Sequence, residues 1–490
     1  MPMKPFILAK EIILLLLVSL IAVSCAINPV TGKKELMLMS EAQEIQMGAQ
    51  YDPQVIATFG EYQDEQILSF IQTRADEMGK ISHRPTLKYH VKILDSPVIN
   101  AFAVPGGYIY LTRGILAQFN NEAELMGVLG HEMGHITARH SVSNQSKQTL
   151  GQLLLIGGMI ASEEFASYAQ YALQGMQLLF LKFSRDNERQ ADQLGVAYSS
   201  QIGYDANKMA DFFQVLKKMS LPEEQGGVPT FLSTHPDPAD RYNAVKRDTK
   251  MWQDSLKMDN YKVNADNYMH MIDGIIYGED PRQGYVEGNS FYHPEMKFSF
   301  SFPAGWQFEN LPTQVNMAPS DGKALLVFTF APGSTLDEAA NNALEQLELK
   351  PQESLRTSIN NLPAIVTQSK QVYQDQSTGQ QQSNIIMSCF IEYDNTCFVF
   401  HGVTAEANFN IYSDPFVATM NTFSRLTDPV KLNKKPVKIL VKRVQRTGTL
   451  ADALRYYGVQ QDSMDELAFL NNLELTDVVQ SGKLIKVTGY

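Results

Sequence analysis

Hydrophobic and polar positions change their period several times along the first part of the chain. Residues 28–80 have helical spacing, and Ser40–Glu44 supplies a capping pattern for a helix that starts there. Residues 87–94 alternate between apolar and polar as a strand does. A second extended stretch, 99–112, is interrupted by Pro105-Gly106-Gly107, which predicts a hairpin. This part of the chain is therefore predicted to be α+β.

Two further helices are predicted by apolar positions that recur at helical spacing. The first covers 121–140, where Asn121 can cap the helix and Glu124 stands three residues later. The second covers 184–200. Between them, 151–183 is apolar and helical in character, but its apolar run is too short to cross a bilayer.

The second half of the chain is predicted to be rich in strands. The strictly alternating segment Phe298–Phe302 is typical of a half-buried strand, whereas 336–349 has the spacing of a helix. Stretches rich in turn formers and charge mark two linkers. The predicted parts are 26–277, a linker at 278–289, an α/β domain at 290–430, a linker at 431–436 and a small closing domain at 437–490.

Composition fits a multidomain globular chain. With 490 residues, of which 44% are hydrophobic and 19% charged, the chain is too long for one hydrophobic core. The formal net charge of -12 and the lack of a basic block argue against a nucleic-acid partner, since phosphate binding needs clustered Lys and Arg.

The first 25 residues are predicted to be a signal peptide. The apolar run Ile12–Val23 is shorter than a membrane span requires. The segment Ile21-Ala22-Val23-Ser24-Cys25 resembles a bacterial lipoprotein processing site, which implies that Cys25 is lipidated. Ala26, which is not Asp, implies sorting to the outer membrane, so the protein is expected in the periplasm, held to the membrane by a lipid anchor.

Export puts the remaining cysteines where disulfides are permitted. Cys389 and Cys397 flank Glu392–Asn395, which looks like a hairpin turn. A two-residue turn there pairs Cys389 with Phe400 rather than with Cys397. We therefore predict two buried free thiols.

His131-Glu132-Met133-Gly134-His135 carries the chemistry. On a helix, the two imidazoles lie one turn apart and can bind one metal ion, with Glu132 on the same side as a general base. A catalytic zinc site needs a third protein ligand. Glu188 is the best candidate, because Asp192, one turn beyond it, can orient a ligating imidazole through a hydrogen bond.

At this point the sequence resembles the zinc metallopeptidase family that includes the CAAX prenyl protease, HtpX and BepA. The resemblance covers roughly residues 30–250. Its motifs are Asn100-Ala101-Phe102, Pro105-Gly106-Gly107, His131–His135, Ser184-Arg185 with Glu188, Ala191-Asp192, and Ser233-Thr234-His235-Pro236 with Arg241.

The resemblance implies a mainly helical gluzincin metallopeptidase domain with a small edge sheet and one zinc ion per chain. It implies that Asn100, Ala101 and Phe102 form an edge strand that pairs with the substrate backbone. It also implies that His235 lies near the metal, either stabilising the oxyanion or latching the site in a resting form, and that Arg241 orients this loop.

Two resemblances concern the C-terminal half. Residues 292–306 resemble the opening of the PsbP-like α/β sandwich. Residues 437–487 resemble a LysM-like module, predicted as strand-helix-helix-strand, which implies possible binding to peptidoglycan.

The function expected from all of this is an envelope endopeptidase that acts on unfolded or misassembled proteins. Two alternatives remain open at this stage. One is a tethering or peptidoglycan-binding protein whose peptidase is latched or inert, and the other is a zinc-dependent peptidoglycan hydrolase.

Overall fold

A computed structural model describes residues 25–147, 183–218, 231, 235, 240–374 and 381–490. The signal-peptide prediction for 1–24 and the helical prediction for 151–182 lie outside these residues. The chain divides into two compact units. Gly60–Tyr277 and Lys438–Gly489 belong to the first, together with the residues up to Ile56, and Gly278–Val437 makes up most of the second. Among the described residues, no helix has the length and apolar character needed to cross a membrane.

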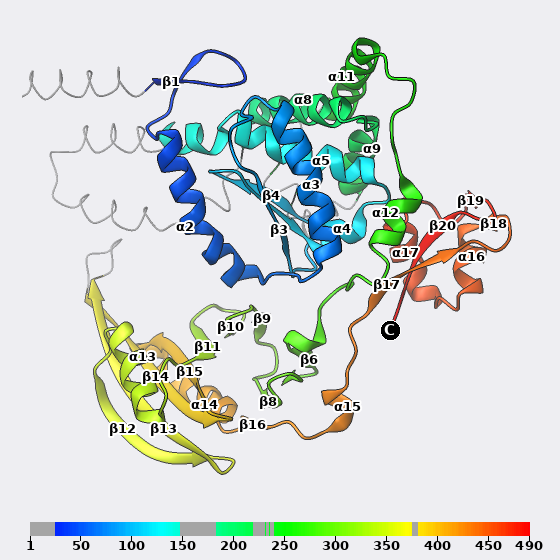
Figure 1. The fold of residues 1–490 in the computed structure, drawn as a ribbon. Coiled ribbons are helices and arrows are strands. Elements are labelled where there is room, and N and C mark those ends of the chain that lie inside the picture. The colour runs from blue at the N-terminus through cyan, green and yellow to red at the C-terminus, as the bar shows by residue number, and fades with distance from the viewer. Residues whose placement is uncertain (1–24, 148–182, 219–230, 232–234, 236–239, 375–380) are drawn as a thin grey trace, which may run out of the picture. The chain divides into compact units, whose positions relative to one another are not determined.

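The first unit is mainly helical around a short sheet (Figure 1). Its helices before the second unit are α2 (Glu41–Phe59), α3 (Glu65–Ile81), α4 (Arg113–Gln118), α5 (Glu122–Thr137), α8 (Arg185–Gln201), α9 (Asn207–Lys218), α11 (Arg241–Leu256) and α12 (Ala265–Met271). Three of the predicted helix starts are confirmed by their caps. Ser40 and Ser184 each form a capping box, and the Asn121 side chain accepts a hydrogen bond from the Glu124 amide.

The short sheet has the order β3-β5-β4, where β3 is His90–Leu94, β4 is Ala101–Val104 and β5 is Tyr108–Thr112. Strands β4 and β5 form the predicted antiparallel hairpin, and β3 runs parallel to β5. Strand β4 therefore lies at the edge of the sheet, where one side of its backbone is not paired within the sheet.

The helical prediction is wrong for the residues before Ser40. There the chain forms a β-hairpin of β1 (Cys25–Ile27) and β2 (Lys34–Leu36). The Asn28 side chain accepts hydrogen bonds from the amides of Val30 and Thr31, which favours a turn over a helix.

Helix α5 is the centre of the first unit, and all of its residues are buried. It packs against α8 (Figure 1), and glycines from both helices meet at the crossing. A Cβ atom on Gly195 would lie 2.9 Å from the amide nitrogen of His131, and one on Gly130 would lie 3.0 Å from the carbonyl oxygen of Gly195. These glycines let the two helix backbones approach to a distance that any side chain would prevent.

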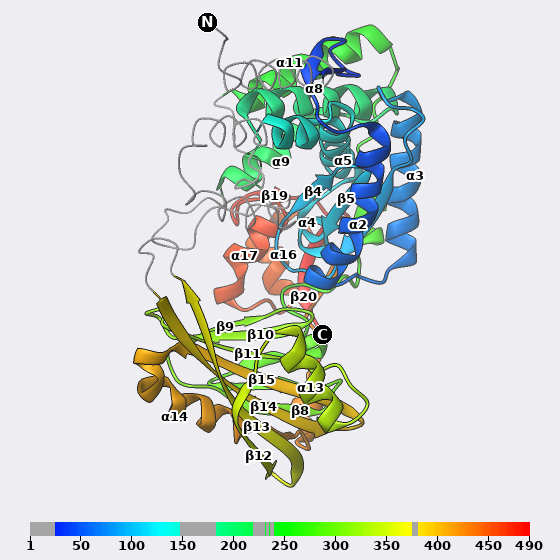
Figure 2. The same ribbon diagram turned by 90° about the vertical axis from the view of Figure 1, so that its left-hand side faces the viewer.

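The segment after the second unit has the strand-helix-helix-strand order that was predicted. It consists of β17 (Lys438–Arg443), β18 (Gly448–Thr449), α16 (Leu450–Tyr456), α17 (Met464–Leu470), β19 (Val478–Val479) and β20 (Leu484–Gly489). Its apolar residues join the same hydrophobic core as those of helices α3, α5 and α9. The ammonium group of Lys486 is buried and donates to the carbonyl oxygens of Ala117, Gln118 and Phe119 at the end of α4, beside which this segment lies (Figure 2).

The chain leaves the first unit and returns to it at neighbouring positions. Ile276 and Lys438 form an isolated antiparallel bridge, and the Ile439 amide donates to the carbonyl oxygen of Ile275.

The second unit is a layered α/β structure. A seven-stranded antiparallel sheet has the order β12-β13-β14-β15-β11-β10-β9, and a four-stranded sheet has the order β16-β8-β7-β6. Helix α13 covers one face of the larger sheet, while α14 and the smaller sheet pack on the other. The bounds are β6 (Tyr285–Glu287), β7 (Ser290–His293), β8 (Phe298–Ser301), β9 (Gln307–Asn310), β10 (Gln314–Ala318), β11 (Ala324–Phe330), α13 (Leu336–Gln346), β12 (Pro351–Ile359), β13 (Leu362–Gln374), β14 (Gln381–Tyr393), β15 (Thr396–Ala405), α14 (Phe409–Met420), β16 (Ser424–Arg425) and α15 (Pro429–Leu432), with short 3₁₀ turns at Pro281–Gln283, Glu406–Asn408 and, in the first unit, Gln461–Ser463.

The cysteine prediction is confirmed in this unit. Asp394 and Asn395 both have positive φ, as a two-residue type I′ turn requires, and Cys389 pairs with Phe400. Both Cys389 and Cys397 are free and buried.

Candidate metal centre

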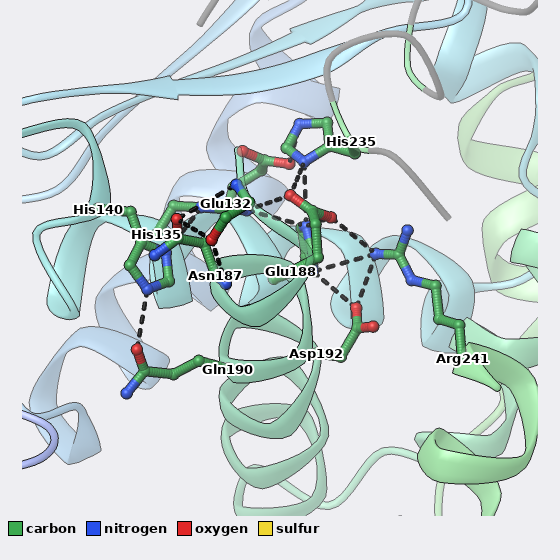
Figure 3. Close-up of polar contacts among 11 residues, drawn as sticks. Glu132, His135, His140, Asn187, Glu188, Gln190, Asp192, His235 and Arg241 are labelled. Carbon is green, nitrogen blue, oxygen red and sulfur yellow. Dashed lines mark hydrogen bonds and ion pairs between the residues drawn. The ribbon is translucent and has the colours of Figure 1, made fainter. Parts of the chain in front are cut away.

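Helices α5 and α8 bring three potential metal ligands together. His131 and His135 lie one turn apart on α5, with 3.1 Å between their Nε2 atoms. Glu188, in the first turn of α8, places its carboxylate oxygens 3.5 Å from His131 Nε2 and 3.4 Å from His135 Nε2. His235 reaches the same point, with Nδ1 3.3 Å from His131 Nε2 and 3.1 Å from Glu188 Oε1 (Figure 3).

These four side chains fit a zinc ion. All four are buried, and one donor atom from each lies within 4.8 Å of the others. Tetrahedral bonds of 2.0–2.1 Å place neighbouring donors about 3.3 Å apart, close to the separations found here. Glu188 Oε2 is buried without a hydrogen-bond partner among the described residues, as expected for an atom that faces a cation.

Asp192 lies beside the first histidine. Its Oδ1 atom is 2.9 Å from His131 Nδ1 and accepts a hydrogen bond from Arg241 Nη2 at 2.7 Å. A proton on Nδ1, which faces this carboxylate, leaves His131 Nε2 free to bind the metal. The Arg241 guanidinium also lies 3.6 Å from the centre of the Phe213 ring, so it is held on two sides.

His140 and Gln190 orient the second histidine. His140 Nε2 lies 2.9 Å from Gln190 Oε1, and His140 Nδ1 lies 3.0 Å from His135 Nδ1. Burial lowers the pKa of His140 to about 4, so the ring is neutral. A neutral His140 that donates to Gln190 accepts from His135 Nδ1, and this leaves His135 Nε2 for the metal.

The His140 ring thus faces the site, although a helix that continued to residue 140 would turn it away. Helix α5 ends at Thr137, and Arg139 has a φ of 56°, which turns the chain so that His140 returns to His135. The helical spacing assumed to continue to residue 140 gave no sign of this. Gln190 was also not predicted, because a single amide on a polar helix face carries no distinguishing signal.

The protonation states suit a metal site. Burial lowers the pKa values of His131 and His135 well below the usual range, which keeps both rings neutral. Burial opposes the charged form of Glu188, but His235 and His135 outweigh it and hold its pKa well below the ordinary value. Two neutral imidazoles and one ionised carboxylate are the ligand forms that zinc binds.

Glu132 lies beside the metal position. Both of its carboxylate oxygens are buried without a hydrogen-bond partner among the described residues, and His235 Nε2 is 3.6 Å from Oε1. Burial raises the pKa of Glu132 to about 7, in part opposed by His235. A carboxyl group with this pKa can both accept and return a proton near neutral pH.

The remaining predicted residues lie as follows. Ala101 and Phe102 are on the edge strand β4, and Asn100, which directly precedes it, donates its amide to the Thr112 hydroxyl. Cys25 lies at the start of β1, and the residues before it are outside the described part.

A buried site with two histidines on helix α5 and a glutamate on helix α8 defines a zinc metallopeptidase. Residues 63–249 match the model of peptidase family M48. This finding confirms the predicted resemblance to the metallopeptidase family.

Several characterised proteins are similar over this region. The chain is 29% identical over 226 residues to the beta-barrel assembly-enhancing protease of Yersinia pestis, covering 44% of this chain and 46% of that protein. It is 31% identical over 167 residues to the mitochondrial metalloendopeptidase OMA1 of Schizosaccharomyces pombe, covering 34% and 48%. The chain thus spans about half the length of these relatives.

A solved structure resembles another part of the chain. The cyanobacterial PsbP protein of Synechocystis matches with a TM-score of 0.22 and 9% identity, covering 29% of this chain and 94% of that protein.

Proposed function

We propose that this protein is a zinc-dependent metalloendopeptidase of a bacterial cell envelope that cleaves unfolded or misassembled proteins. The observation that carries the proposal is the buried ligand set His131, His135 and Glu188 with Glu132 beside it. A lipid on Cys25 would hold the enzyme to the outer membrane on its periplasmic side. The name of one relative, the beta-barrel assembly-enhancing protease of Yersinia pestis, supports this setting.

Each residue of the site has a distinct task in peptide hydrolysis. Zinc held by His131, His135 and Glu188 supplies Lewis acidity toward the scissile carbonyl and the attacking water. Glu132 accepts a proton from that water and returns it to the leaving nitrogen, and its pKa of about 7 suits both steps. Asp192 keeps His131 in the tautomer that binds the metal.

The edge strand β4 supports a substrate without a fixed sequence. An extended peptide that adds to the edge formed by Ala101 and Phe102 gains hydrogen bonds through its backbone, whatever its side chains. Such pairing suits unfolded chains, because their backbone groups are free to pair. Asn100 helps to fix the start of this strand through its bond to Thr112.

His235 is proposed to latch the resting site. Its Nδ1 atom takes a fourth donor position next to His131 and Glu188, where the attacking water must bind. Substrate binding would then have to displace this ring. Arg241, six residues further along the chain, donates a hydrogen bond to Asp192 and is proposed to orient His235.

The closing segment 437–490 is proposed to recruit the enzyme to peptidoglycan. Its sequence motif supports this role. The metal site supports hydrolysis of peptide bonds over a purely tethering role, because the Glu132 carboxylate is buried beside the metal ligands without a hydrogen-bond partner among the described residues.

The test uses the protein from Cys25 onward, its Glu132→Gln variant and its His235→Ala variant. We expect one zinc per chain in the wild type and in Glu132→Gln, and cleavage of unfolded casein that falls at least about 10²-fold in Glu132→Gln. His235→Ala should keep zinc and cleave faster. Retained turnover in Glu132→Gln would contradict the role of the base, and cleavage of purified sacculi without cleavage of casein would favour the peptidoglycan hydrolase.

A further inference from the structure

A buried ion cluster lies at the end of the helix that carries the zinc ligands. Its central residue is Glu44 of α2, whose side chain is 1% exposed. Glu44 accepts hydrogen bonds from Arg84 Nη1 at 2.8 Å and from Arg139 Nε at 2.8 Å. A buried carboxylate between two arginines is costly to desolvate, so stability alone does not explain such a cluster.

On one side, the cluster holds the end of α5. Arg84 Nη1 also donates to the carbonyl oxygen of Ile136, the residue after the ligand His135. Arg139 lies just after the helix, in the left-handed turn that brings His140 back to His135. Glu44 therefore binds two arginines at the end of the metal-binding helix. Arg84 donates a hydrogen bond to its last turn, and Arg139 lies in the turn that follows it.

On the other side, helix α2 touches the turn between β4 and β5. The Gly106 amide lies 3.4 Å from Glu44 Oε1 and donates to it. A Cβ atom on Gly106 would lie 2.9 Å from the carbonyl oxygen of Glu44, and one on Gly48 would lie 2.2 Å from that of Pro105. The backbones of α2 and the turn are thus in direct contact, and no side chain can be inserted between them.

A small cavity lies where these parts meet. Its volume is about 10 Å³, room for one water, and its lining includes Glu44, Arg139, the ligand His135 and the β4 residues Ala103 and Val104. The Glu44 carboxylate is therefore hydrogen-bonded both to the turn that follows the edge strand, through Gly106, and to the residue Arg139 that follows the zinc helix.

We propose that Glu44 is a positioning residue that sets the separation between the edge strand β4 and the metal-binding helix α5. The inference rests on the proposed function, in which β4 holds the substrate backbone. A substrate paired with β4 reaches the metal in register only if this separation is fixed, and a displacement of about 1 Å costs on the order of 10²-fold in rate.

The chain offers a matched control. Glu41, one turn earlier on α2, pairs with the same arginine, Arg84, at 2.8 Å, but its side chain is 57% exposed and has no contact with Arg139 or the turn among the contacts described here. Glu44→Gln and Glu41→Gln remove the same charge from the same helix. Glu44→Asp keeps the charge and shortens its reach.

The experiment compares two substrates in the zinc-loaded protein. One is a peptide of about eight residues, long enough to pair with all of β4, and the other is a blocked tripeptide that is too short to do so. For Glu44→Gln and Glu44→Asp we expect kcat/KM to fall about 10- to 100-fold on the long peptide, mainly through KM, and less than about threefold on the tripeptide. Glu41→Gln should stay within about twofold on both.

A merely structural role predicts a parallel loss on both substrates, in proportion to the folded fraction, and this result would overturn the inference. Amide hydrogen exchange provides a readout that does not need activity. In Glu44→Gln, residues 101–107 and 134–139 should together exchange faster, about tenfold, while α11 is unchanged. If the wild type cleaves neither substrate, the proposed function fails, and exchange still decides the role of Glu44. Unchanged exchange in both segments would refute it.

Discussion

Replacing Asp192 by asparagine is expected to weaken zinc binding while leaving the shape of the site intact. Asp192 Oδ1 lies 2.9 Å from His131 Nδ1 and accepts a hydrogen bond from Arg241 Nη2. An asparagine side chain keeps one oxygen at this position, replaces the other by an amide nitrogen and removes the charge. Asp192→Ala removes the charge and both contacts.

The expected magnitudes follow from these contacts. Loss of an outer-shell partner of a zinc ligand typically costs 10- to 100-fold in metal affinity, or about 1.4–2.7 kcal/mol. We expect Asp192→Asn at the lower end of this range. Asp192→Ala should fall at the upper end, because Arg241 Nη2 already lies 3.5 Å from Glu188 Oε2 and would then compete with the metal for that carboxylate.

The assay is competition for zinc with a fluorescent chelator at neutral pH. Asp186→Asn is the matched control, since Asp186 lies in the first turn of the same helix but its side chain is 91% exposed. It should bind zinc as the wild type does. If both Asp192 variants bind zinc within about threefold of the wild type, Asp192 does not orient His131 in the way described.

Three further predictions concern packing and titration elsewhere in the chain. Burial lowers the pKa of Lys486, so the unfolded state binds more protons than the folded state. The free energy of unfolding of the wild type should therefore rise relative to that of Lys486→Met as pH increases from 7 toward 10, by at most about 1.4 kcal/mol per pH unit. If urea unfolding gives the same difference between the two proteins at every pH in this range, the prediction is contradicted. Gly195→Ala should destabilise the first unit by about 1–3 kcal/mol in thermal unfolding and weaken zinc binding, because the added Cβ would press on the His131 backbone. A variant as stable as the wild type would show that α5 and α8 can move apart at no cost. Burial raises the pKa of Cys389 to about 12, so Cys389 and Cys397 should react with a thiol reagent only after denaturation, and rapid reaction of the native protein would refute their burial.

The parts of the fold that were predicted correctly depend on local sequence. The helix starts at Ser40, Asn121 and Ser184 follow from side chains that reach amides three residues away. The register of the β14–β15 hairpin follows from the left-handed residues Asp394 and Asn395. The metal ligands on α5 share one helix, so their spacing alone brought them together.

What could not be predicted depends on contacts between distant residues. Asn28 belongs to a hairpin partly because its amide donates to the carbonyl oxygen of Ala138, far along the chain. Glu44 was taken only as part of a capping pattern, whereas its partner Arg139 is far away in sequence. His140 and Gln190 contact each other because the end of α5 packs against α8. The spacing of apolar residues along the sequence does not predict this packing.

The bridge between Ile276 and Lys438 has a consequence for the history of this chain. The chain leaves the first unit and returns to it at adjacent points, so the second unit is inserted in the chain as a loop would be. Strand β17, which follows the second unit, packs into the core formed by residues that precede the second unit. Long insertions at such sites add little loop-closure entropy, since this cost grows only with the logarithm of length. The site thus tolerates the gain, loss or exchange of a whole domain, while the core of the first unit remains dependent on residues that follow the second unit.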